Sequence, residues 1–254
     1  EGKVLKTCTL EPEKEDRIIF FTDGVSQSGM GSDDFPFGWE RENILSYVSG
    51  LVTADASLSA NTLAAKIVTM AHKNDGYRAR DDISCSVIYF REPRKLLIST
   101  GPPYEKDKDT ELASKIKNYQ GKVIICGGTT ADIVARELNR KIVDELIFED
   151  PELPPESFIE EIDLVTEGIL TLQKVNEILK TFNNSVHLGK GPADKIVKLL
   201  MESDEIHFII GTRINIAHQD PSLPVELEIR RTVVKRIARL LEDKWLKKVS
   251  FEYI

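Results

Sequence analysis

The stretch KVIICGGTTAD, residues 122–132, shows the pattern that decides the fold of most of this chain. A short apolar run such as VIIC predicts a buried strand, and the Gly-Gly pair after it predicts a break. The following residues, 131–139, have helical composition. The same alternation of apolar runs and helical periodicity continues from residue 96 to the C-terminus. It predicts an α/β domain, with a mostly parallel sheet covered by helices.

The periodicity places the elements of this domain as follows. Strands are expected at residues 96–99, 122–126, 163–166, 206–210 and 249–253. Helices are expected at 106–120, 131–139, around 172–179, 194–203 and about 225–245.

The first third of the chain follows a different pattern. The run RIIFF (17–21) predicts a strand that ends at Thr22-Asp23-Gly24, and residues 83–90 predict a second strand rich in Val, Ile and Tyr. Two helical segments, 41–51 and 60–72, lie between them. This order predicts an α+β half-domain made of antiparallel strands and two helices. The sequence REPR (91–94) interrupts the pattern, so we place the domains at 1–92 and 93–254.

Composition narrows the class of protein. Of the 254 residues, 41% are hydrophobic and 30% are charged, which is enough apolar material for a folded core. The net charge of −8 disfavours general nucleic-acid binding, which needs a basic face. Cys8, Cys85 and Cys126 are far apart, which excludes a disulfide framework and fits a reducing cytoplasm. No run of about 18 apolar residues exists, so we expect no membrane span in this chain.

Two acidic turns form the first candidate site. Asp23 and Asp81 each lie at the end of a predicted strand, and the two would converge at one sheet edge if the strands are neighbours. Converging carboxylates suit Mg²⁺ or Mn²⁺, and such a metal can activate a water for attack on a phosphoryl group. The alternative is ordinary turn chemistry, because Asp-Gly and Asp-Asp are common in turns.

Three motifs carry a resemblance to a known family: IIFFTDGV (18–25), FGWE (37–40), and DDIS (81–84) leading into an apolar strand. In identity, order and separation they resemble the C-terminal half of a PPM-type metal-dependent serine/threonine phosphatase, of the bacterial branch related to stage II sporulation protein E. The resemblance implies that Asp23 and Asp81 each ligate a catalytic Mn²⁺ or Mg²⁺ and that Gly24 permits the turn. It also implies that Asp82 is a turn or supporting residue. Ser84 stands where the family usually has Thr.

The family's other metal motif, an acidic Gly-Asp segment followed by His-Gly, is missing from the 22 residues before Asp23. The sequence therefore contains half of a two-metal site, and we assign no catalytic residue and expect no phosphatase activity from this chain alone. Glu1 as the first residue favours a piece of a longer phosphatase. The resemblance implies a phosphorylated bacterial regulatory protein, of the anti-sigma-factor antagonist type, as the substrate. A half-domain exposes strand edges and an apolar face, so we expect it to pair with a second copy or to pack on the second domain.

The turn Gly127-Gly128-Thr129-Thr130 is the second candidate site. It lies at the start of a predicted helix, where free backbone N–H groups and the helix dipole attract anions. The alternative to anion binding is an ordinary helix cap after a tight turn. The turn is neither a P-loop nor a GxGxxG fingerprint. It is similar to a turn in sugar-phosphate sensor domains of DeoR-type regulators and ribose-phosphate isomerases, which implies that Thr166 and Glu167 share its crevice. Lys190 and Arg213 are candidate counter-charges. The second functional hypothesis is therefore an α/β sensor or interaction module that binds a phosphorylated small molecule.

Overall fold

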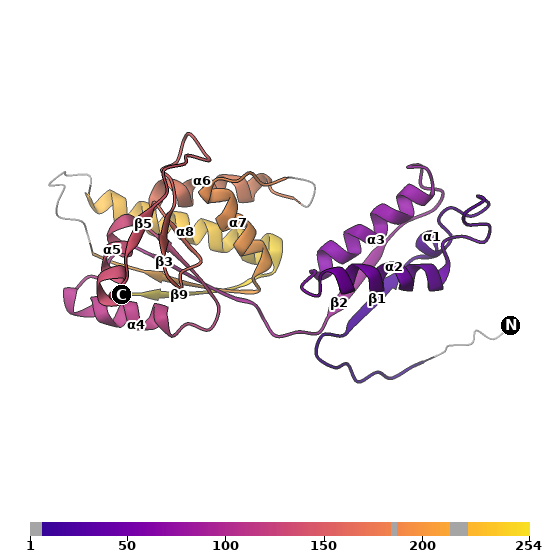
Figure 1. The fold of residues 1–254 in the computed structure, drawn as a ribbon, viewed down its shortest axis with the longest axis horizontal. Coiled ribbons are helices and arrows are strands. Elements are labelled where there is room, and N and C mark those ends of the chain that lie inside the picture. The colour runs from indigo at the N-terminus through magenta and orange to yellow at the C-terminus, as the bar shows by residue number, and fades with distance from the viewer. Residues whose placement is uncertain (1–6, 184–186, 214–222) are drawn as a thin grey trace. The chain divides into compact units, whose positions relative to one another are not determined.

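The computed structural model describes residues 7–183, 187–213 and 223–254 (Figure 1). The chain divides into two compact units, Glu1–Glu92 and Pro93–Ile254, and each is described by itself below. Together they give an α/β fold with a mixed, mostly parallel seven-stranded sheet and a small antiparallel two-stranded sheet. The fold class predicted from the sequence is therefore confirmed.

The first unit is a two-stranded sheet with helices on one side. Its elements are β1 (Arg17–Phe21), α1 (Asp23–Ser26), α2 (Glu40–Ala54), α3 (Ala60–Asn74) and β2 (Cys85–Tyr89). The strands are antiparallel, with Arg17 opposite Tyr89 and Phe21 opposite Cys85. This register places the end of β1 beside the start of β2, which is where both acidic turns lie.

Alternation along the strands builds the core of this unit. Ile19 and Val87 pack against the buried stripe of α3, whose Leu63, Ile67 and Ala71 recur every four residues. The next residues along the strands point to the other face, where Phe20 is 55% exposed and Ile88 is 46% exposed. One face of the sheet is therefore covered by helices and the other carries exposed apolar side chains.

The second unit alternates strands and helices. Its strands are β3 (Lys95–Thr100), β4 (Lys122–Cys126), β5 (Ile142–Asp144), β6 (Ser157–Ile159), β7 (Leu164–Thr166), β8 (Glu205–Ile210) and β9 (Lys248–Tyr253). Its helices are η1 (Lys106–Lys108), α4 (Asp109–Lys117), α5 (Gly128–Glu137), α6 (Ile169–Thr181), α7 (Pro192–Glu202) and α8 (Leu223–Trp245).

The strand order across the sheet is β5-β6-β7-β4-β3-β8-β9. The five strands from β7 to β9 are parallel, whereas β5 and β6 add an antiparallel edge. The chain moves outward from β3 to β4 and β7, and then crosses back to β8 on the other side of β3. This reversal is a topological switch point, and open α/β sheets bind ligands at the carboxyl ends of strands near such a point.

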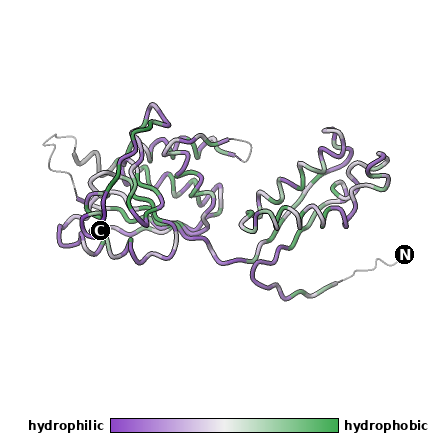
Figure 2. The backbone as a smooth tube through the Cα atoms, in the orientation of Figure 1, coloured by the Kyte–Doolittle hydropathy of each residue, from purple (hydrophilic) through white to green (hydrophobic). Residues whose placement is uncertain are grey.

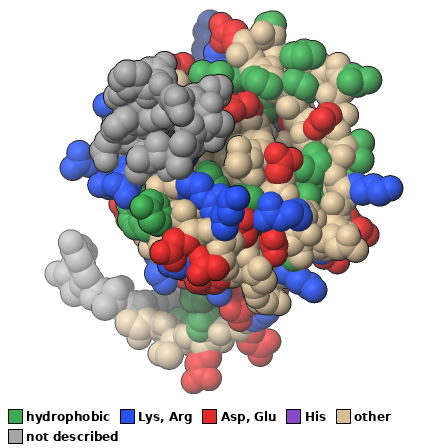
Figure 3. All heavy atoms as spheres, turned by 90° about the vertical axis from the view of Figure 1, so that its left-hand side faces the viewer, with side chains coloured by type: hydrophobic (Ala, Val, Ile, Leu, Met, Phe, Trp, Pro, Cys, Tyr) green, Lys and Arg blue, Asp and Glu red, His purple; other side chains and the backbone are tan. Residues whose placement is uncertain are grey.

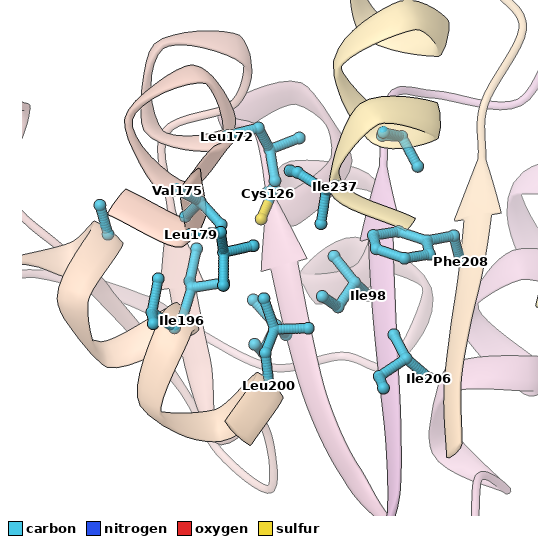
Figure 4. Close-up of a cluster of buried hydrophobic side chains, with 14 of the residues drawn as sticks. Ile98, Cys126, Leu172, Val175, Leu179, Ile196, Leu200, Ile206, Phe208 and Ile237 are labelled. Carbon is cyan, nitrogen blue, oxygen red and sulfur yellow. The ribbon is translucent and has the colours of Figure 1, made fainter. Parts of the chain in front are cut away.

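Helices cover both faces of this sheet. One core cluster joins the sheet to α4 and α5, and a larger one joins it to α6, α7 and α8. Figure 4 shows the larger cluster, with Phe208 and Ile98 on the sheet facing Leu172, Leu200 and Ile237 on the helices. The strands of this sheet are the most hydrophobic part of the trace in Figure 2, as expected for strands buried on both faces. Among the described residues, no helix has the length and apolar character needed to cross a membrane.

Several predicted boundaries were wrong. The helix expected at 131–139 begins at Gly128, so residues 128–130 form its first turn and Gly127 alone lies outside the helix. The helix expected at 106–120 opens as the 3₁₀ turn η1 and ends at Lys117. The Asp-Gly segment after β1 forms the single helical turn α1. The three-residue strands β5 and β6 were not predicted, because their pairing depends on β7 and on each other.

Candidate functional site

Thr22 joins the two acidic turns of the first unit. Its backbone N–H donates to the carbonyl oxygen of Ser84 at 3.1 Å, and its hydroxyl donates to the carbonyl oxygen of Asp82 at 2.5 Å. The backbone N–H of Ser84 donates back to the Thr22 hydroxyl at 3.0 Å. These bonds continue the β1–β2 pairing past the strand ends and hold the segment before β2 against the segment after β1.

Gly24 allows the two turns to touch. A Cβ placed at this position would lie 2.5 Å from the carbonyl oxygen of Asp82, and that oxygen belongs to rigid backbone. Any side chain here would have to push the Asp81–Asp82 segment away from α1. The glycine is therefore needed for close approach rather than for an unusual φ angle.

The structure places Asp23 and Asp81 at the same end of the β1–β2 pair, and both are exposed to solvent. Asp23 begins α1, while one carboxylate oxygen of Asp81 accepts the backbone N–H of Asp82 at 2.8 Å. The remaining oxygens are the hard ligands that Mg²⁺ or Mn²⁺ prefers. Within the described residues, no three His, Cys, Asp or Glu side chains gather in a way that could enclose a metal ion. These two carboxylates fit one side of a metal site and do not complete it.

A buried carboxylate supports the loop beside this site. Asp75 accepts the backbone N–H of Gly29 at 2.8 Å through Oδ1 and that of Arg80 at 3.3 Å through Oδ2. The Arg80 guanidinium donates to the carbonyl oxygen of Met30 at 2.6 Å. Asp75 thus connects the end of α3 to the segment that follows α1. Both of its carboxylate oxygens already accept backbone hydrogen bonds, so its role is structural.

The second unit has a pocket of about 460 Å³ at the carboxyl ends of its parallel strands. Its walls come from the ends of β3, β4 and β7, the starts of α5 and α6, and α8. The lining residues used below are Thr100, Gly128, Thr130, Glu167, Arg213 and Arg230. The volume is within the range of small-molecule sites, about 300–1,000 Å³.

A contact between two glycines fixes the position of this pocket. A Cβ on Gly211, after β8, would lie 2.1 Å from the carbonyl oxygen of Gly101, which follows β3. The two backbones therefore touch and fill the crevice between β3 and β8. Arg230 extends over them, with its Nη1 donating to the Gly211 carbonyl at 3.4 Å. As a result, the open space at the switch point lies over β3, β4 and β7.

The first turn of α5 presents its backbone N–H groups to the pocket. The first helical bond runs from the N–H of Ala131 to the carbonyl of Gly127 at 3.0 Å, so the N–H groups of residues 128–130 precede the helical ladder. No side chain caps this helix. A Cβ added to Gly128 would meet nothing within 4 Å. The helix end is therefore both uncapped and open to an approaching anion.

Two buried hydroxyls in the pocket wall are unsatisfied. Thr100 and Thr130 are each 1% exposed, and neither Oγ1 has a hydrogen-bond partner among the described atoms. A buried hydroxyl without a partner costs about 1–3 kcal/mol. Ser99 and Thr171, which do not line the pocket, also carry such hydroxyls, so this property does not by itself mark a ligand site. Thr166 is different, because its hydroxyl donates to the carbonyl of Glu167 at 2.8 Å.

Both signs of charge line the pocket. Arg213 and Arg230 are positive, and Glu167 is negative. The Arg213 guanidinium also lies 3.5 Å from the buried carboxylate of Asp109 and donates to the carbonyl of Tyr104 at 3.2 Å, so it is held in place. Figure 3 shows the face of this unit on which acidic, basic and apolar side chains are interspersed.

Cys126 lies at the floor of the pocket without being reactive. Burial raises the pKa of its thiol to about 12, and the Thr166 hydroxyl, whose oxygen lies 3.6 Å from the sulfur, acts in the opposite direction. Figure 4 shows its sulfur pointing into the hydrophobic cluster. A thiol that stays protonated at neutral pH is a poor nucleophile, so Cys126 is part of the core.

The structure therefore brings Gly127, Gly128, Thr129, Thr130 and Glu167 into one pocket, with Arg213 beside them. Lys190 lines a separate cavity of about 320 Å³. Sequence reasoning missed Thr100 and Arg230 as site residues. Thr100 ends an apolar strand before Gly-Pro-Pro, a signal that could have identified it, whereas Arg230 reaches the site only through the packing of α8.

Comparison of the chain with protein-family models, with curated proteins and with solved structures finds no match in any of the three.

Proposed function

We propose that this chain is the C-terminal portion of a PPM-type metal-dependent serine/threonine phosphatase related to stage II sporulation protein E. In this proposal, Asp23 and Asp81 hold Mn²⁺ or Mg²⁺. The observation that supports it is the contact between the two acidic turns, where Gly24 lies against the backbone of Asp82. Acidic turns form without binding a metal, but a metal site requires that carboxylates from two such turns come close together.

When bound, the metal would lower the pKa of a water and orient it toward a phosphoryl group. The residues of this chain supply ligands and their support: Thr22 and Gly24 hold the two turns together, and the two aspartates present oxygens. Because a two-metal site needs carboxylates on both sides, further ligands must come from outside the described residues. We expect the complete site to act on a phosphorylated bacterial regulatory protein, of the anti-sigma-factor antagonist type, in cytoplasmic signal transduction.

The test is the melting temperature of the full chain with and without millimolar Mn²⁺, together with turnover of p-nitrophenyl phosphate. A ligand of the native state stabilises it, so Mn²⁺ should raise the melting temperature of the unaltered chain. Asp23→Asn and Asp81→Asn should each remove the shift, whereas Asp34→Asn, an exposed aspartate of the same unit, should keep it. An equal shift in the unaltered chain and in all three variants would exclude Asp23 and Asp81 as ligands of Mn²⁺. Turnover by the chain alone would show that it holds a complete site.

The second unit supports a different candidate function, that of a binding module for a phosphorylated small molecule. The observation that favours it is the pocket of about 460 Å³ at the carboxyl ends of the strands, with an uncapped helix in its wall. The two functions are compatible in one protein. They can be separated because Mn²⁺ should stabilise the first unit and an organic phosphate the second.

A further inference from the structure

We infer that the second unit associates with further copies of this chain through the two outer strands of its sheet, with β5 of one copy beside β9 of the next. Among the described strands of this sheet these two are outermost, and each pairs with a neighbour on one side only (Figure 1). The other side of an edge strand presents backbone N–H and C=O groups, to which a further strand can bind. The inference is independent of both proposed functions.

The two edges carry opposite charge. The segment 142–150, which contains β5, has four acidic residues and no basic one. The segment 244–253, which contains β9, has three lysines and one acidic residue, Glu252, which already pairs with Lys115 of α4. Two β5 edges, or two β9 edges, would bring like charges together and repel each other. A β5 edge and a β9 edge attract each other, so the same charges that prevent pairing of like edges favour pairing of unlike edges.

These charges are not cancelled within each edge. Glu145 and Glu149 are exposed, and no basic residue in the described part of the chain forms an ion pair with either. Lys244 and Lys247 donate to carbonyl oxygens rather than to carboxylates. The third lysine, Lys248, pairs with an acidic residue of β8. The β5 edge therefore stays negative and the β9 edge stays positive.

Exposed apolar side chains lie at both edges. Each edge has an almost fully exposed leucine: Leu146, just after β5, is 90% exposed, and Leu246, just before β9, is 89% exposed. Each edge also has two partly exposed apolar side chains, which are Val143 and Phe158 at the first edge and Phe251 and Tyr253 at the second. Contact between the edges would remove apolar surface of both from water, which stabilises association.

The topology places these apolar side chains on one face of an extended sheet. Ile142 packs toward α4 and α5, so the next residue, Val143, and Phe158 opposite it point to the face covered by α6, α7 and α8. Phe251 stacks on Phe208, which belongs to the core cluster of that same face. Because β5 is antiparallel to β6, and β6 to β7, β5 runs parallel to β9. A copy that continues the sheet in the same orientation therefore brings both apolar sets to the same face.

Pairing of unlike edges is head-to-tail, so every bound copy still offers one free edge. We expect the mass of the assembly to rise with protein concentration beyond that of a dimer. Because the attraction is between exposed charges, raising the ionic strength from about 0.05 M to about 0.5 M should weaken the association.

The experiment is sedimentation equilibrium of the full chain over a range of concentrations. Leu146→Lys puts a positive charge on the β5 edge, and Leu246→Asp puts a negative charge on the β9 edge, so each opposes the edge that it must meet. Leu170→Lys and Leu170→Asp are the matched controls, because Leu170 is an exposed leucine in α6 of the same unit. All three positions are exposed, so the melting temperatures of the variants should equal that of the unaltered chain.

We expect Leu146→Lys and Leu246→Asp each to weaken the association about tenfold or more, and the Leu170 variants to leave it unchanged. Mixing equal amounts of Leu146→Lys and Leu246→Asp should restore association. The reason is that the unaltered β9 edge of the first variant can pair with the unaltered β5 edge of the second.

Three results would overturn the inference. A chain that stays monomeric at every concentration does not pair through these edges, whatever other partner they bind. Association that is equal in the unaltered chain, Leu146→Lys and Leu246→Asp places the contact elsewhere, for example on the first unit, which neither substitution touches. Association that is lost in both variants and not restored by mixing them would show that unlike edges do not pair.

Discussion

Replacing Gly24 by alanine tests whether the close contact of the two acidic turns is real. The added Cβ would lie 2.5 Å from the Asp82 carbonyl oxygen. An ordinary carbon–oxygen contact begins at about 3.3 Å, so the backbone would have to move by about 0.8 Å. Overpacking of this kind costs about 1–3 kcal/mol. Alanine lowers the entropy of the unfolded chain and offsets about 0.5–1 kcal/mol of that, so we expect a net loss of about 1–2 kcal/mol.

Urea denaturation followed by tryptophan fluorescence can report on the first unit alone. The chain has two tryptophans, Trp39 in the core of the first unit and Trp245 in the second. In a Trp245→Phe background, Trp39 is the sole reporter. The matched control is Gly50→Ala, which lies inside α2 with open space around it and should stabilise the unit by about 0.5–1 kcal/mol. If Gly24→Ala is as stable as Gly50→Ala, the two turns do not touch as described.

Three further predictions concern single side chains. Asp75→Ala should destabilise the first unit by about 1–3 kcal/mol in the same urea assay, because the backbone N–H of Gly29 loses its acceptor; an unchanged midpoint would contradict this. Thr130→Val should leave the melting temperature of the ligand-free second unit equal or higher, because it removes an unsatisfied buried hydroxyl, and a clear decrease would show that the hydroxyl has a partner. For Cys126, the unfolded chain releases the thiol proton near pH 9, whereas the folded chain keeps it up to about pH 12. The free energy of unfolding should therefore fall as pH rises through this window, by at most about 1.4 kcal/mol per unit, and Cys126→Ala should show a shallower slope in denaturation at several pH values.

The sequence was informative where local chemistry decides the structure. Residues 17–21 and 122–126 are apolar runs bounded by a charged residue and a turn, and both are strands with those limits. The start of α5 was misplaced because Gly-Gly suggested a break of several residues. Gly127 alone makes that break, with a φ of 128°, and Gly128 already has helical geometry.

The parts that could not be predicted depend on contacts between distant segments. β5 and β6 have three residues each and are strands only because they extend the edge of the sheet beside β7. The pocket could not be predicted without the strand order, since Thr100 and Thr130 come from different elements and line one pocket only because β3 and β4 are neighbours. The proximity of Asp23 and Asp81 was predicted on the condition that their strands pair, and β1 and β2 do pair. Whether they bind metal stays a prediction.

The most direct test of the central claim is the electron paramagnetic resonance signal of free Mn²⁺ titrated with the full chain. The account predicts that the chain removes Mn²⁺ from solution, up to about one ion per chain, because two carboxylates form one side of the site. It also predicts that Asp23→Asn and Asp81→Asn each abolish this uptake while Asp34→Asn retains it. No loss of free Mn²⁺, or a loss that survives both substitutions, would contradict the assignment of these aspartates as metal ligands.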